Sequence, residues 1–189
     1  MSKNTWQDQL TVPVRVMQII VLALASGCAT FAVIVIVLNL GGQEGPEAAQ
    51  PDLLVITYAA LAAIVPMLIA FFVLRSIWNS QARRLVIKAV DEASGESSDL
   101  RPTQWLESTK IVSMLVPVFQ TRLIIGAALF EGTAFFLLIA YMVEGSIIAL
   151  VAALAVAVGI LLQFPTRSGV AGWIEQQTEA VRNQRQFSR

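Results

Sequence analysis

The chain has 189 residues, of which 56% are hydrophobic and 14% are charged, and its formal net charge is zero. A soluble domain usually carries about 25% charged residues, so this composition is typical of a membrane protein. The chain has no His and a single Cys, Cys28, which excludes histidine-based catalysis, CxxC metal or redox sites and a disulfide within one chain. We therefore expect no metal and no cofactor. The net charge of zero gives no indication of a nucleic-acid partner, so none is expected.

Four apolar runs predict four transmembrane helices, because about 20 apolar residues span the hydrocarbon core of a bilayer. The runs are Val14–Leu40, Leu53–Leu74, Leu123–Val143 and Ser146–Phe164. The thirteen Lys and Arg residues lie at or before the start of the first run, between the second and third runs, or after the fourth. Since positive residues stay in the cytoplasm, we predict that both termini and the middle segment are cytoplasmic.

This pattern predicts an all-α, multi-pass protein of the plasma (cytoplasmic) membrane with its helices in two hairpins. The segments are a first hairpin (1–75), a cytoplasmic connecting segment (76–121), a second hairpin (122–167) and a cytoplasmic amphipathic tail (168–189). Gly41–Asp52, rich in Gly, Pro and acids, predicts an exposed turn in the first hairpin. Glu144-Gly145 forms the second turn, with Ser146 as the expected N-cap of the fourth helix.

The first run contains a stretch that needs a separate interpretation. Leu24-Ala25-Ser26-Gly27-Cys28 is similar to a lipoprotein signal, but apolar sequence continues from Ala29 to Leu38. A cleaved signal has a shorter apolar core, so we expect an uncleaved first helix.

The connecting segment predicts a helix over Ile77–Ala93, a break over Ser94–Pro102 and a second helix over Thr103–Val116. Pro117 is expected to kink or end that second helix. This second predicted helix places five residues on one face: Trp105, Leu106, Thr109, Val112 and Val116. The tail places another set near one face: Val170, Trp173, Ile174, Gln177 and Val181. Both faces fit helices at the membrane interface, and they equally fit helices that pack against each other.

The two hairpins share sequence. Ile19–Ile34 aligns without gaps on Ile124–Ile139 with eight identical positions, and Ala59–Ala62 aligns on Ala152–Ala155. An internal duplication explains these identities, and the narrow residue usage of apolar helices is the alternative. Because both hairpins start inside, a duplication would be a parallel repeat about an axis along the membrane normal.

Glu131 is the only charged residue well inside a predicted span. It lies nine residues after Arg122, or about 13 Å along a helix, which places it near the bilayer midplane. A carboxylate there costs about 2.5–3.5 kcal/mol on insertion scales, so such residues usually face a bundle interior. Ser26, its counterpart in the proposed repeat, and Thr30 one turn on are the expected hydrogen-bond partners. Pro66 is expected to kink the second helix and to free a carbonyl at similar depth.

The stretch from Thr121 to Phe136, with an Arg at its start, small residues around a central Glu and aromatics after it, resembles the carboxylate helix of rotary-ATPase proteolipid (c) subunits. The resemblance implies that Glu131 binds a proton or sodium ion. Gln163-Phe164-Pro165-Thr166-Arg167, with the Trp-containing charged tail that follows, is similar to small uncharacterised four-helix bacterial membrane proteins. That second resemblance implies no activity.

No enzyme motif is present: the sequence has no Walker glycine-lysine loop, no GxGD pair and no HExxH. We therefore expect a structural or accessory membrane protein without enzyme activity. Its expected partners are the lipid bilayer and either a second copy or another membrane protein. The alternative is a small proton- or ion-linked transporter or channel that uses Glu131, with Ser26 and Thr30 beside it. Glu131 itself is open to three interpretations: a packing residue, an ion-binding residue or an oligomer contact.

Overall fold

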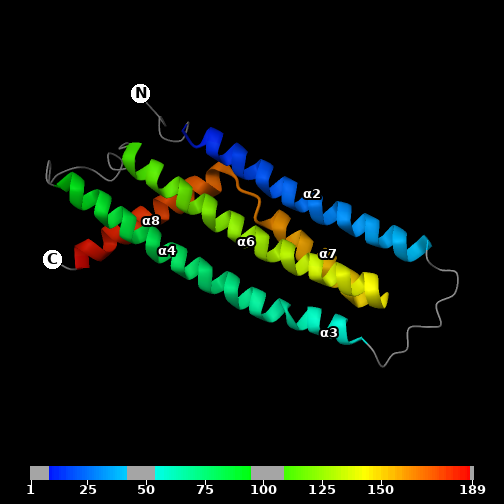
Figure 1. Cartoon of the computed structure of the whole chain (residues 1–189). Coiled ribbons are helices and arrows are strands. Elements are labelled where there is room, and N and C mark those ends of the chain that lie inside the picture. The colour runs from blue at the N-terminus through cyan, green and yellow to red at the C-terminus, as the bar shows by residue number, and fades with distance from the viewer. Residues whose placement is uncertain (1–8, 42–53, 95–108, 188–189) are drawn as a thin grey trace. The chain divides into compact units, whose positions relative to one another are not determined.

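A computed structural model describes residues 9–41, 54–94 and 109–187, which are all-α. Figure 1 shows the helices in chain order. They are α2 (Thr11–Gly41), α3 (Val55–Ala62), α4 (Ile64–Ser94), α6 (Thr109–Glu144), α7 (Ile147–Leu162) and α8 (Arg167–Phe187). The predicted turn over 42–52, the predicted break over 95–102, and Trp105 and Leu106 lie outside the described residues.

Three helical stretches are long and apolar enough to cross a membrane: Thr11–Gly41, Val55–Ala89 and Ile111–Glu144. A fourth span is obtained when α7, which has 16 residues, is taken together with α8 after the break between them. The first three stretches contain most of the first three predicted runs. The protein is therefore membrane-embedded, with three to four spans by length and composition.

The second span is divided near Pro66. α3 ends at Ala62, Ala63 is a turn residue, and α4 begins at Ile64, so Pro66 lies in the first turn of α4. The first turn of a helix tolerates proline because its N–H groups have no partner within the helix. Hydrogen bonding continues across the break, since Ala63 N–H donates to the Ala59 carbonyl at 3.0 Å and Met67 N–H donates to the Ala63 carbonyl at 3.2 Å.

The sequence predicted that Pro117 would kink or end a helix. The prediction that it ends the helix is wrong. α6 runs for 36 residues with Pro117 inside it. Pro117 is exposed, and its carbonyl accepts a hydrogen bond from the Thr121 hydroxyl at 2.9 Å. A proline removes only one ladder bond and brings its ring against the preceding turn. The packing and hydrogen bonding of the helix on both sides of Pro117 outweigh this local free-energy cost.

Contacts divide the chain into two compact units. Unit 1 comprises 1–18, 73–123 and 165–189, and unit 2 comprises 19–72 and 124–164. These boundaries fall close to the ends of the apolar runs. All thirteen Lys and Arg residues belong to unit 1, and the sequence of unit 2 contains none. The chain therefore separates into a unit that holds every cation and a unit that holds most of the apolar sequence.

Unit 1 has an apolar core built from α4, α6, α8 and the start of α2. Its buried residues are Leu10, Val14, Ala82, Val86, Ala89, Ile111, Val112, Leu115, Val170, Ala171, Trp173, Ile174 and Val181. The five tail residues that the sequence placed near one face of α8 are all buried. This face therefore packs against the protein, which favours the packing interpretation over a face that lies on the membrane surface.

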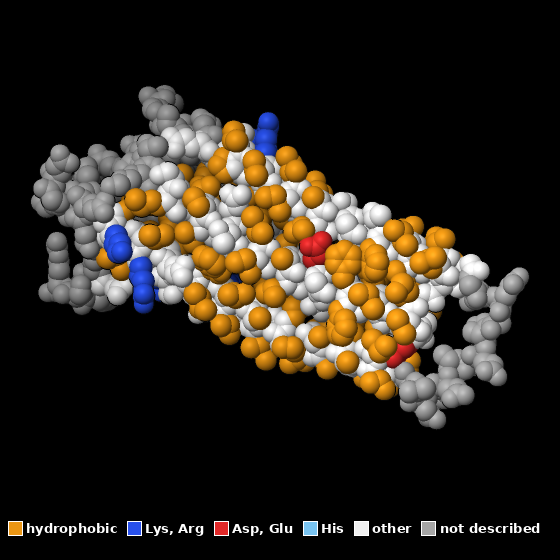
Figure 2. Space-filling view, viewed as in Figure 1, with side chains coloured by type: hydrophobic (Ala, Val, Ile, Leu, Met, Phe, Trp, Pro, Cys, Tyr) orange, Lys and Arg blue, Asp and Glu red, His pale blue; other side chains and the backbone are white. Residues whose placement is uncertain are grey.

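Unit 2 combines a core of small and large apolar side chains with an apolar surface. On α7 the buried face is Ala149, Ala153, Val156 and Ile160, at helical spacing. Large hydrophobic side chains remain exposed on α2, α3, α4, α6 and α7, and Figure 2 shows hydrophobic side chains over much of the face that it displays. A surface of this kind suits contact with lipid, which solvates apolar side chains as well as a protein core does.

Candidate functional site

Glu131 lies on α6 within unit 2 and its side chain is only partly buried. Its carboxyl faces α2 at Gly27, where a Cβ atom would lie 3.6 Å from Glu131 Oε1. A Cβ atom at position 27 would thus be in ordinary van der Waals contact with the carboxyl, so α2 lies directly beside Glu131. One turn further along both helices, the rings of Phe31 and Phe135 meet edge to face with centroids 5.1 Å apart. The difference in residue number between the α2 residue and the α6 residue is the same in both contacts, as expected for two parallel helices.

Ser26 and Thr30 do not bind Glu131 in the structure. Both side chains are exposed on α2, and the Ser26 hydroxyl donates to the carbonyl of Ala23 in its own helix at 2.8 Å. Within the described residues, Glu131 forms no hydrogen bond and no ion pair. Among the α2 residues, Gly27 rather than either hydroxyl lies against the Glu131 carboxyl.

Two further glycines, one on α6 and one on α7, lie at close contacts between these two helices. At Gly159 of α7, a Cβ atom would lie 2.5 Å from the Phe130 ring, so this ring occupies the space that a side chain would need. The Phe130 ring also meets Phe71 of α4 edge to face, with centroids 5.3 Å apart. At Gly126, a Cβ atom would lie 2.7 Å from Gln163 Oε1. Sequence reasoning missed these contacts, although isolated glycines in apolar helices often mark a close approach.

Glu144, at the last position of α6, binds the start of α3. Its two carboxylate oxygens accept the backbone N–H groups of Ile56 at 2.7 Å and Thr57 at 2.8 Å. The residue before α3, Leu54, provides no side-chain cap, so Glu144 satisfies donors that the first turn of a helix leaves free. Sequence reasoning assigned Glu144 only to a turn. The signal for its role was the missing Ser, Thr, Asp or Asn directly before Val55.

Ser146 stands at the expected N-cap position of α7, but its side chain makes no capping hydrogen bond. Gly145 before it has a φ of 64°, a conformation that glycine adopts without strain. The tight reversal between α6 and α7 therefore depends on Gly145 rather than on a cap by Ser146.

A polar group connects three helices of unit 1. Asn79 Oδ1 on α4 accepts hydrogen bonds from Arg122 of α6 and from the Trp173 indole of α8, both at 3.3 Å. Gln18 donates to the Pro165 carbonyl at 2.9 Å, which joins α2 to the start of the tail. These contacts fix unit 1 but bring no reactive side chains together.

Within the described part of the chain, no group of three or more His, Cys, Asp or Glu residues could hold a metal ion. Comparison with protein families, with curated proteins and with solved structures found no match. The chemistry that the residues can perform is therefore the basis for a functional proposal.

Proposed function

We propose that this protein is a structural or accessory protein of the cytoplasmic membrane that associates with a second copy of itself through the surface around Glu131. It would span the membrane four times as two hairpins, with both termini in the cytoplasm. The confinement of all thirteen cations to unit 1 supports this topology, because cytoplasmic segments carry the excess of Lys and Arg.

The observation that carries the proposal is the partly exposed Glu131 carboxyl without a hydrogen-bond partner in the described residues. A polar group in hydrocarbon without a partner is costly. A second protein helix can supply that partner, whereas lipid tails cannot. The self-association therefore replaces an unfavourable contact between a carboxyl and lipid with a hydrogen bond.

The α2 surface beside Glu131 is suited to such a contact. Ser26 and Thr30 are exposed one turn apart, and small residues with hydroxyl groups allow close approach and hydrogen bonding between membrane helices. The Ser26 hydroxyl donates to Ala23, but its oxygen can still accept a hydrogen bond from the protonated carboxyl of a second chain. The Thr30 hydroxyl is likewise exposed to a second chain.

Self-association can be measured by energy transfer between labelled copies in liposomes at increasing dilution in lipid. Wild type should associate, Glu131→Gln should retain association because its amide still hydrogen-bonds, and Glu131→Leu should lose it. Ile139→Leu, an exposed apolar change on the same helix, is the matched control. Unchanged association in Glu131→Leu would contradict the proposal.

A second candidate is a proton- or ion-linked transport function of the same carboxyl. The partial exposure of Glu131 supports it, because a carboxyl that loads and releases an ion has to be accessible. Proton flux into liposomes, measured for wild type and Glu131→Gln together with thermal stability, tests this function. Flux that is lost in a stable Gln variant supports transport, and the absence of flux in both proteins contradicts it.

A further inference from the structure

Two arginines from different helices of unit 1 lie where the apolar runs end. Arg75 of α4 directly follows the run that ends at Leu74. Arg122 of α6 directly precedes the run that begins at Leu123. Asn79 lies one turn after Arg75 on α4, and its side-chain oxygen accepts a hydrogen bond from Arg122 at 3.3 Å. The Arg122 side chain therefore reaches the face of α4 that carries Arg75.

The two arginines have no acidic partner in the described part of the chain. Arg75 is exposed and forms no side-chain hydrogen bond or ion pair there, and the Arg122 guanidinium donates only to Asn79. The positive charge of Arg75 is near enough to Arg122 to repel it. Along their own helices, the nearest acids are Asp91, 16 positions from Arg75, and Glu131, nine positions from Arg122, or about 24 and 13 Å away. An anion between the two guanidinium groups would remove their repulsion.

The surroundings of the two arginines hold more hydrogen-bond donors than acceptors. The Asn79 oxygen is shared between Arg122 and the Trp173 indole of α8, at 3.3 Å from each. The indole N–H of Trp78, three positions after Arg75, is buried and has no acceptor within the described residues. Each guanidinium carries five N–H donors, so a single amide oxygen leaves most of them without a partner. A phosphate, which combines acceptor oxygens with negative charge, suits such a donor-rich group of side chains.

The depth of the two arginines indicates that this phosphate belongs to a lipid. Each arginine is the residue next to an apolar run, so both side chains start at the edge of the hydrocarbon core. The polar headgroup layer begins at this edge and is about 5–8 Å deep on each side of the bilayer. Arginine side chains extend from apolar surface toward such a polar layer. Tryptophan is enriched at the same boundary, and Trp173 binds the Asn79 oxygen that also binds Arg122.

We propose that Arg75 and Arg122 together bind the phosphate of an anionic phospholipid headgroup. Two cations without an acidic partner favour a lipid with net negative charge over a zwitterionic one, because only the former leaves the site without excess positive charge. The site is independent of the self-association proposed above, since its residues belong to unit 1 and Glu131 belongs to unit 2.

The test is native mass spectrometry of the purified full chain from mixed micelles that contain equal amounts of phosphatidylglycerol and phosphatidylcholine. Wild type should retain phosphatidylglycerol in preference. Arg75→Gln should lower that preference about fivefold, since one cation at an anionic surface contributes about that gain in affinity. Arg75→Gln/Arg122→Gln should lower it about 25-fold. The single variant leaves the bond between Arg122 and Asn79 in place, so it remains informative if the double variant does not fold.

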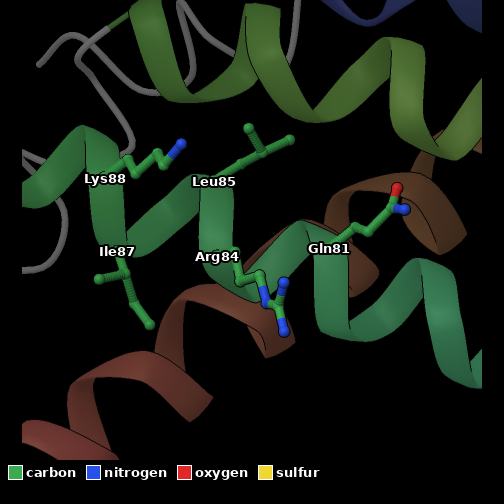
Figure 3. A pocket seen from close by; sticks show the side chains of 5 residues that line it. All are labelled: Gln81, Arg84, Leu85, Ile87 and Lys88. Carbon is green, nitrogen blue, oxygen red and sulfur yellow. The ribbon is translucent and has the colours of Figure 1, made fainter.

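Arg84 provides the matched control on the same helix. It lines an open hollow of about 460 Å³ further along α4, together with Lys88 (Figure 3). Arg84 is exposed, as Arg75 is, and follows it by nine positions, or about 13 Å along the helix. This distance exceeds the depth of the headgroup layer. Arg84→Gln therefore removes the same charge from α4 and should keep the lipid preference of wild type.

Four results would overturn the proposal. Equal retention of both lipids by wild type would show that the protein does not select an anionic headgroup, and an unchanged preference in Arg75→Gln would show that this arginine does not bind it. An equal or larger loss in Arg84→Gln would indicate diffuse attraction to the positive charges of unit 1. Displacement of the lipid by millimolar inorganic phosphate would indicate a site for small soluble anions.

Discussion

The Glu144 carboxylate at the end of α6 accepts the backbone N–H of Thr57 at 2.8 Å, from a residue 87 positions earlier in the chain. The neighbouring N–H of Ile56 donates to the other carboxylate oxygen at 2.7 Å. A negative group at a helix N-terminus is also favoured by the helix dipole. One side chain thus joins the start of the second span to the end of the third.

Glu144→Ala should lower the thermal unfolding midpoint, because it leaves two donors of α3 without their partner. The unfolding midpoint of Glu144→Gln should lie between those of Glu144→Ala and wild type, since the amide oxygen can still accept one hydrogen bond. Thermal unfolding in detergent, followed by circular dichroism, measures both. Equal midpoints for wild type and Glu144→Ala would show that the capping contact contributes nothing to stability.

Gly159→Ala should destabilise the protein by about 1–3 kcal/mol, because the new Cβ atom overpacks a filled space. The clash is with the Phe130 ring, 2.5 Å from that Cβ position. Gly132→Ala is the control on α6, since a Cβ there meets nothing within 4 Å. The free energy of unfolding measured by denaturant titration in micelles should fall only for Gly159→Ala, and Gly159→Ala/Phe130→Leu should regain part of the loss.

Phe31 and Phe135 should be energetically coupled, since their rings meet edge to face at 5.1 Å. A double-mutant cycle with Phe31→Leu and Phe135→Leu should give a coupling of about 0.5–1.5 kcal/mol. The cycle with Phe31→Leu and Ile148→Ala provides the control, because Ile148 is an exposed residue on another helix. Coupling energies of the same size in both cycles would argue against a direct ring contact.

Asn79→Ala should destabilise unit 1 by about 1–3 kcal/mol, because the Trp173 indole and Arg122 lose their shared acceptor. Asn183→Ala, at an exposed position of α8, should have little effect. Thermal unfolding followed by tryptophan fluorescence reports on both variants. A redshift of the native emission in Asn79→Ala alone would further indicate that the Trp173 environment has opened.

Helix type and membrane character could be predicted from the sequence because they depend on the length and apolarity of each run. The tail face that includes Trp173 and Ile174 could be predicted for the same reason, since helical spacing decides which side chains share a face. Spacing could not decide what covers that face. The burial of Val170 and Val181 required the positions of α4 and α6, which are distant in sequence.

The surroundings of Glu131 show where prediction from the sequence stops. The sequence shows Glu131 as a lone acidic residue within an apolar run, but which α2 residue lies against it depended on the rotation of α2. A difference of one residue decides whether Ser26 or Gly27 faces α6, and a helix rotates by about 100° per residue. Similarly, the sequence predicted that Pro117 would kink or end a helix, and only the structure shows that α6 continues through it.

The composition of unit 1 has a consequence for biosynthesis. Its core joins Leu10 and Val14 near the start of the chain to Ile174 and Val181 near its end. Apolar segments of unit 2 can enter the membrane one after another as they leave the ribosome. The core of the N-terminal residues is complete only after translation has passed residue 181, because its α8 members are made last. Completion of unit 1 is therefore a late event, and a chain that stops after residue 164 lacks the part of this core that α8 contributes.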